Sequence, residues 1–401
     1  MRKNRILTYT AVFIIIISTF TLIQGYSRFL LENKFFLVGI LAVLITLYYP
    51  KVYLKTSISW LIFYTIVLLL NYLYGDEVID FKFILLEITF YFVPSALFLI
   101  CLKNNDLKSL EIISISILLV IVITSVLTIL QAEATPGIVR RILAKEGDYT
   151  YTMQQFRKGV TNYAMPHALP FIVPPLIYAL KEKKNLFKER LPALIFLVIV
   201  SFVIFYTEST GALIILFFSV ITSLILSKKS LGKNIIRLIG LGFLAGIFLN
   251  TQTLTSVLNF FGAKTETMEY FWKILSIETL LETGQYTGGI AERKELHDLS
   301  IYAFLNNPLL GTDKSSEIGG HSYFMDRAGL VGLIGFLPLF LFFFFQIKIT
   351  YEYLPSSTKM YYLIGIAGCI ILGFQKNMGG FEYWLYLFFL LPALCILIPR
   401  I

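Results

Sequence analysis

The sequence predicts an all-α fold: a polytopic integral membrane helical bundle with about twelve transmembrane helices and one large helical extracytoplasmic loop. Hydrophobic residues make up 57% of the 401 residues and charged residues only 15%, which is too little polar surface to cover a soluble globule. Apolar runs long enough to cross a bilayer recur along the whole chain. These runs lack the alternation of β-strands, so helices are the expected spanning elements.

The apolar runs define the expected spans in chain order. The first run follows basic residues and lacks a small-residue cleavage site, so we interpret it as an uncleaved helix. Prolines in the sixth run predict a bent helix. No internal repeat or linker divides the sequence, so residues 1–401 form a single predicted membrane-embedded domain. The predicted spans are 7–24, 35–49, 57–73, 82–102, 109–130, 162–180, 191–207, 211–227, 235–250, 328–347, 360–374 and 381–398.

An even number of spans places both termini on one side of the membrane. With the N-terminus inside, the cytoplasmic loops hold more Lys and Arg than the external segments, as the positive-inside rule requires. We therefore expect both termini to be cytoplasmic. Two longer segments, 131–161 and 251–327, then lie outside the membrane.

Two helices are expected within the external segment 251–327. A helix from about 291 to 306 should end before Pro308. An amphipathic helix is predicted earlier in the segment by apolar residues at helical spacing, namely Met268, Phe271, Trp272, Leu275 and Leu281.

Charge and cysteine usage exclude several classes of function. The net charge is +9, but the basic residues are scattered over short loops rather than gathered on a soluble face, which argues against nucleic-acid binding. Walker loops, metal-ligand clusters and dinucleotide fingerprints are absent from the sequence, so we expect neither a metal nor a cofactor. The cysteines lie within apolar runs, which indicates packing rather than a disulfide or metal site; they are Cys101, Cys369 and Cys395.

His321 is the sharpest candidate for chemistry. It lies in the stretch Gly319–Arg327, just before a glycine-spaced span, where it would sit at the outer mouth of a helix. Neutral imidazole accepts a proton from a hydroxyl near neutral pH, which suits a general base. The alternative is a histidine that only holds the loop by hydrogen bonds. Arg327, in the same stretch, is a weaker candidate.

A second candidate stretch carries Arg157 and, ten residues later, His167. A guanidinium at the outer rim can bind two phosphate oxygens through parallel hydrogen bonds. The alternative for Arg157 is contact with lipid head groups. His167 is a weaker candidate. Arg140 and Arg141 are also weaker candidates, because a basic pair in a loop is more often simply solvated.

A third candidate stretch begins at Glu292. Arg293 and His297 are four residues apart and share a helix face, so both could point toward an anion. A solvated helix face is the alternative, and it is the better interpretation for His297. Glu87, within the fourth span, is ionisable at membrane depth and is expected to make a structural contact inside the bundle.

These stretches resemble the O-antigen ligase and polymerase family of multi-span glycosyltransferases. His321-Ser322, followed after nine residues by Gly332 and after two more by Gly335, resembles the family's C-terminal signature. Asn307–Thr312 resembles its Asn-Pro-Leu-Leu-Gly run, with Asp313 where a glycine is usual. Residues 157–166 resemble its Arg-x-x-Gly…Pro-Asn stretch, with Gly159 displaced by one residue. Residues 207–212 resemble its Thr-x-Ser-Arg-Gly-Ala segment, with Thr210 in place of the arginine.

The resemblance implies a metal-independent, inverting glycosyltransferase in the bacterial inner (plasma) membrane. Its donor would be an undecaprenyl-diphosphate-linked glycan, and its acceptor a glycan or lipid-linked molecule. His321 would act as the catalytic base or orienting group, and Arg157 and Arg293 would bind the diphosphate. The resemblance also suggests two further partners, namely membrane lipid and a chain-length regulator.

Two activities within the family, and one outside it, fit these features. A polymerase extending repeat units into O-antigen, capsular or exopolysaccharide is the preferred interpretation. The alternative is an O-antigen ligase that transfers lipid-linked glycan to lipid A core or another acceptor. A flippase or other transporter is a distant alternative, because the charges cluster at the outer rim rather than at the midplane and no inverted repeat is evident.

Overall fold

The computed structural model describes residues 2–27, 34–74, 80–135, 138, 149–183, 185, 190–207, 209–226, 276, 279–280, 283–312 and 314–400. These residues form helices and connecting turns, and no β-strand occurs among them. The predicted span 235–250, the apolar residues that predict the first external helix, and the pair Arg140 and Arg141 lie outside the described ranges.

The helices follow one another in an order close to that predicted. The longer helices are α1 (Arg2–Thr19), α4 (Lys34–Tyr48), α5 (Thr56–Tyr74), α6 (Phe81–Lys103), α7 (Leu107–Ala134), α11 (Val173–Glu182), α12 (Leu191–Tyr206), α13 (Thr210–Ile225), α17 (Gly288–Asn306), α18 (Tyr323–Tyr353) and α19 (Lys359–Gln375). Shorter elements are α2 (Thr21–Gln24), η1 (Pro50–Leu54), α9 (Tyr149–Arg157), α10 (Ala164–Ala168), η2 (Leu169–Ile172), η4 (Ser315–Glu317), α20 (Phe381–Leu385), η5 (Tyr386–Leu390), α21 (Leu391–Leu397) and η6 (Ile398–Arg400).

Five of the described segments are long and apolar enough to cross a membrane: α5, α6, α7, α18 and the continuous stretch Phe381–Arg400. Each remaining predicted span inside the described ranges coincides with helical residues. The all-α membrane fold is therefore confirmed, while the number of crossings stays a prediction. The helix expected at 291–306 is also confirmed, because α17 ends at Asn306, two residues before Pro308.

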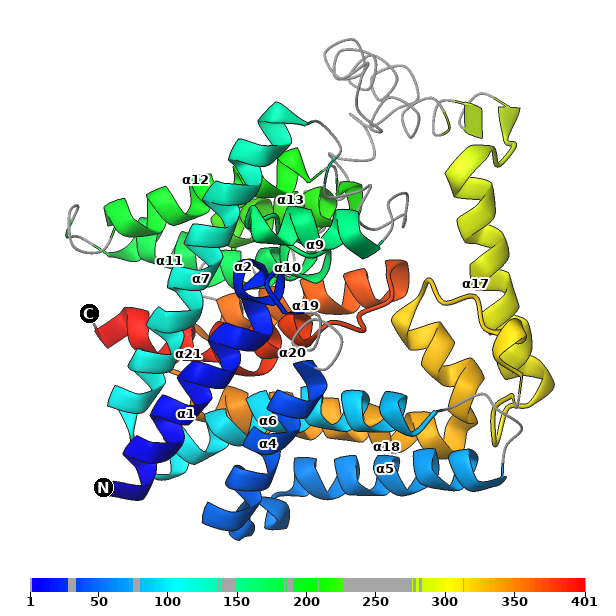
Figure 1. Ribbon diagram of the computed structural model, residues 1–401, viewed down its shortest axis with the longest axis horizontal. Coiled ribbons are helices and arrows are strands. Elements are labelled where there is room, and N and C mark those ends of the chain that lie inside the picture. The colour runs from blue at the N-terminus through cyan, green and yellow to red at the C-terminus, as the bar shows by residue number, and fades with distance from the viewer. Residues whose placement is uncertain are drawn as a thin grey trace.

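The core of the bundle is built around α6 and the C-terminal stretch. In the most apolar part of α6, 78% of the residues are buried, and in that of the C-terminal stretch 89% are buried. The corresponding fraction for α5 is 33%. Trp384 stacks on Phe388 and packs edge-to-face with Tyr91 of α6. The three cysteines are buried thiols, which confirms their expected packing role. The start of α1 and the end of α21 lie at one side of the molecule, and α17 stands at the opposite side (Figure 1).

The span predicted at 162–180 is wrong in one respect, because it is not one continuous helix. It consists of the three short pieces α10, η2 and α11. Pro166 and Pro170 fall in the first two pieces, and Pro174 falls in the first turn of α11. Proline donates no backbone hydrogen bond and clashes with the preceding turn, so repeated prolines interrupt a helix. The prolines therefore coincide with a change from α-helix to 3₁₀-helix and back, and the bend that they predict stays a prediction.

α18 is also interrupted, at Gly332, where φ is +56°. The amides of Leu333 and Ile334 donate to the carbonyls of Pro308 and Leu309 at 2.8 and 3.1 Å, instead of to their own helix. A β-carbon on Gly332 would overlap with the carbonyl of Leu309. The run that follows α17 and the break in α18 therefore interlock through their backbones, which satisfies amides that the break leaves without helical partners.

Candidate functional site

His321 lies in the loop immediately before α18, and side chains hold the backbone on both sides of it. The amide of Gly319 donates to Ser300 Oγ of α17 at 3.0 Å, and Ser300 Oγ donates to Asp326 Oδ1 at 2.7 Å. Asp326 Oδ2 also accepts from the amide of Ser322 at 3.1 Å. The buried Asp326 therefore ties the His321 loop to both α17 and α18.

Two glycines allow α17 to lie close to this loop and to α18. A β-carbon on Gly319 would overlap with the carbonyl of Leu296, and one on Gly329 would come within 2.9 Å of the carbonyl of Ser300. Any larger residue at either position would push α17 away from the His321 loop and from α18. Because Arg293 precedes Leu296 by one helical turn, this close packing brings Arg293 to the same region as His321.

The surroundings of His321 favour its neutral form. Burial lowers the pKa of the half-buried imidazole below its usual value of 6.5, and the positive charges of Lys376 and Arg293 lower that pKa further. The structure thus brings together His321 and Arg293, which the sequence analysis singled out separately. Neutral imidazole at neutral pH can accept a proton from a hydroxyl.

Lys376 and Tyr163 are members of this site that sequence reasoning missed. Lys376 Nζ donates to the Tyr163 hydroxyl at 2.5 Å, and beside them Asn162 Nδ2 donates to Glu382 Oε1 at 2.6 Å. Tyr163 lies in the predicted stretch around Arg157, but its residue type alone gave no signal. Lys376 follows the last residue of α19, and its sequence position, far from every motif, gave none either.

Arg157 contacts the residues that follow α2. Its Nε donates to the carbonyl of Gly25 at 2.8 Å, and its guanidinium lies 5.6 Å from the ring centroid of Tyr26. α9 packs so closely on α2 that a β-carbon on Gly25 would overlap with the Arg157 backbone. The chain following Arg157 reaches the site through Tyr163. A diphosphate-binding role for Arg157 itself stays a prediction.

His167 joins two of the stretches that resemble family motifs. Its Nδ1 lies 2.9 Å from the carbonyl of Tyr163, and its Nε2 lies 2.6 Å from Ser209 Oγ. A carbonyl only accepts, so Nδ1 carries the proton and Nε2 accepts from the serine. Ser209 Oγ in turn accepts from the amide of Ala212 and caps α13. The fully buried His167 thus acts as a structural link between α10 and α13.

Arg327 is held in a buried ion pair with Glu87 of α6. The pair is bidentate, with Arg327 Nε 2.7 Å from Glu87 Oε1 and Nη2 3.0 Å from Oε2. The hydroxyls of Tyr64, Tyr91 and Tyr323 also donate to Glu87 Oε1. The predicted bundle contact of Glu87 is confirmed, and its partner is the arginine that the sequence analysis ranked as a weaker site candidate.

His297 lies on the same side of α17 as Arg293. It is half-buried, and its Nε2 is buried without a hydrogen-bond partner among the described side chains. Nothing in its contacts assigns it a role, so its place in an anion site stays a prediction. Within the described ranges, His, Cys, Asp and Glu side chains form no cluster of three suited to a metal ion.

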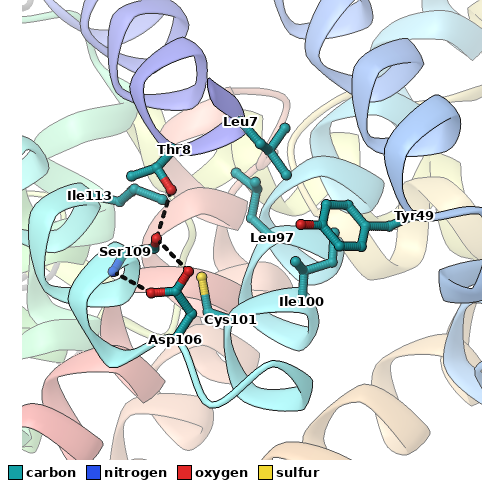
Figure 2. Close-up of a pocket in the computed structure, with 9 residues that line it drawn as sticks. All are labelled: Leu7, Thr8, Tyr49, Leu97, Ile100, Cys101, Asp106, Ser109 and Ile113. Carbon is teal, nitrogen blue, oxygen red and sulfur yellow. Dashed lines mark hydrogen bonds between the residues drawn. The ribbon is translucent and has the colours of Figure 1, made fainter. Parts of the chain in front are cut away.

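A small cavity between α1, α6 and α7 is unrelated to this site. Its volume is about 10 Å³, which is room for a single water molecule. Figure 2 shows Thr8, Ser109 and Asp106 joined in a chain of hydrogen bonds at its edge. Asp106 also caps α7 by accepting from the Ser109 amide at 3.1 Å. These polar groups serve helix packing rather than ligand binding.

Comparison with known proteins adds no relative: no family model matches the chain, and no curated protein matches it significantly. The resemblance to the O-antigen ligase and polymerase family therefore depends on the motif residues quoted above. What the site can do follows from its own chemistry. A neutral imidazole beside two cations, at the end of a membrane helix, suits a substrate that carries both a hydroxyl and an anionic group.

Proposed function

We propose that the protein is a membrane glycosyltransferase that polymerises undecaprenyl-diphosphate-linked oligosaccharide repeat units on the extracytoplasmic side of the membrane. The observation that carries this proposal is the half-buried imidazole of His321 in a loop that packs directly on the helix of Arg293, whose positive charge acts on the imidazole. The all-α membrane fold and the motif resemblance support the same conclusion. A lipid-linked diphosphate donor needs a cationic site at the membrane surface.

His321 is the proposed base in a single inverting displacement. The acceptor hydroxyl oxygen attacks the anomeric carbon of the donor glycan while its proton passes to the neutral imidazole nitrogen. The bond between that carbon and the phosphate oxygen breaks on the opposite face. Undecaprenyl diphosphate leaves with the electron pair, and the imidazolium later returns its proton to water. The products are a lengthened glycan and free undecaprenyl diphosphate.

Arg293 is proposed to neutralise the charge that grows on the leaving diphosphate. Its planar guanidinium donates two parallel hydrogen bonds, which match two phosphate oxygens. In a partly desolvated site this interaction is stronger than in water. A diphosphate stabilised in this way is already a good leaving group, so the proposed reaction needs no metal ion.

The proposal is tested with purified protein in lipid nanodiscs and a synthetic undecaprenyl-diphosphate repeat unit as the sole substrate. A polymerase produces a ladder of products that differ by one repeat unit. Transfer only after addition of a lipid A core acceptor would instead identify a ligase. Absence of transfer with either acceptor, from protein that remains folded, would contradict a glycosyltransferase.

A further inference from the structure

Lys376 occupies a fixed position where several elements of the candidate site meet. It directly follows α19, and its amide donates to the carbonyl of Leu372 at 2.8 Å. Its own carbonyl accepts from the amide of Tyr323, the first residue of α18, at 3.1 Å. The backbone of Lys376 is therefore held by the helix that it ends and by the helix that begins beside His321.

The side chain of Lys376 extends across the site toward α10 and α13. Its ammonium donates to the Tyr163 hydroxyl and lies 5.1 Å from the centroid of that ring. Its Cε lies 3.9 Å from the position that a β-carbon on Gly211 would occupy. The charge thus sits between the segment after Arg157 and the start of α13, at the place where Thr210 departs from the resembled arginine.

The positive charges of Lys376 and Arg293 are carried by different parts of the fold. Both positive charges act on the imidazole, although one follows α19 and the other lies on α17. Two cations at one partly desolvated site repel each other, and an anion lying between them is attracted by both. A diphosphate carries two linked anionic groups, so it can engage both cations at once.

We propose that Lys376 is a substrate-binding residue that holds one phosphate of the lipid-linked diphosphate donor, with Tyr163 as its hydrogen-bonded partner. Arg293 then contacts the other phosphate. A compact lysine ammonium binds phosphate as a point charge, and a phenol that accepts a hydrogen bond from a cation becomes a stronger donor. This inference rests on the proposed function, because that function supplies the diphosphate.

The test measures binding of undecaprenyl diphosphate and of uncharged undecaprenol to the full-length protein by native mass spectrometry. Lys376→Gln should weaken diphosphate binding by about 10- to 100-fold, as loss of a charged hydrogen bond does, and leave undecaprenol binding unchanged. Lys376→Arg should retain diphosphate binding. The matched control is Lys359→Gln: this lysine begins the same helix, its ammonium lies 4.6 Å from the Tyr351 ring centroid, and its loss should have no effect.

Tyr163→Phe gives a second measurement should Lys376→Gln fail to fold, and it should also weaken diphosphate binding. Wild-type affinity in Lys376→Gln, or in Tyr163→Phe if that variant must be used, overturns the inference. If the wild type forms a glycan ladder while Lys376→Gln binds normally, only the role of Lys376 is lost. If binding depends on Lys376 but no glycan is transferred, the proposed function fails and the anion site stands. Equal wild-type binding of both lipids contradicts both.

Discussion

The chemistry of His321 depends on how the surrounding charges set its protonation. Burial, Lys376 and Arg293 lower the pKa of this imidazole below 6.5. A base must be neutral to act, so transfer should be constant near pH 7 and fall only as the pH drops through the lowered pKa. Arg293→Gln removes one positive charge, so the pKa rises and the acid limb of the rate profile moves to higher pH.

The matched control for Arg293→Gln is Lys294→Gln, which removes one charge from the exposed face of the same helix. Lys294 pairs there with Asp298 at 2.6 Å, with both side chains well exposed, so this pair contributes little to stability. The measurement is the rate of glycan transfer between pH 5 and 8 for each variant, normalised to that variant's maximum. The position of the acid limb is then compared between the two variants. An unchanged acid limb in Arg293→Gln would remove Arg293 from the surroundings of His321.

Sequence reasoning found the residues of the site better than it found their contacts. His321 and Arg293 stood out because histidine and arginine are rare at the rim of a membrane bundle. Arg157 stood out for the same reason, yet it is held by Gly25 and Tyr26. Lys376 could not be found, because its place depends on where the end of α19 meets α18 in space. Motif spacing along one chain carries no such information.

Between elements, the ion pair of Glu87 and Arg327 joins α6 to α18. Both side chains are almost fully buried, and breaking a buried pair leaves one uncompensated charge, at a cost of about 3–5 kcal/mol. Glu87→Leu should therefore lower thermal stability in detergent substantially. The double variant Glu87→Leu, Arg327→Met should recover much of that loss. A double variant as unstable as the sum of the single variants would contradict this interpretation.

The backbone interlock between the run after α17 and the break in α18 gives a second prediction about helix packing. Gly332→Ala forces a β-carbon against the Leu309 carbonyl at a positive φ. The run after α17 must then move, which should displace the His321 loop, reduce glycan transfer and lower the unfolding temperature. Gly39→Ala is the control: no atom lies within 4 Å of its added β-carbon, and alanine favours a helix interior by about 0.5–1 kcal/mol. Equal behaviour of the two variants would exclude the interlock.

Helices were more predictable than the breaks within them. Apolar runs matched the helices because lipid requires every backbone group to bond internally. The prolines signalled the interruption in 162–180, although not its division into three pieces. The break at Gly332 was hidden, because the amides of Leu333 and Ile334 are satisfied by carbonyls 25 residues earlier in the chain, and no local pattern reports that contact.

The proposed function requires α17 to face the outside of the membrane and both termini of the molecule to face the cytoplasm. The native cysteines are buried, so single introduced cysteines report membrane sidedness with little background. In intact cells an impermeant thiol reagent should label Glu295→Cys on α17, and should label Asn104→Cys between α6 and α7 only after lysis. The reverse pattern would place the candidate site in the cytoplasm, where the proposed reaction does not occur.

The most direct test of the central claim is the glycan ladder formed by His321→Ala in nanodiscs, compared with the wild type at equal amounts of folded protein. General-base catalysis contributes about 10²- to 10⁴-fold to such a transfer. The variant should therefore still bind the lipid-linked donor while its ladder disappears. A ladder of normal length and rate from folded His321→Ala would contradict the account, because the imidazole would then have no part in the chemistry.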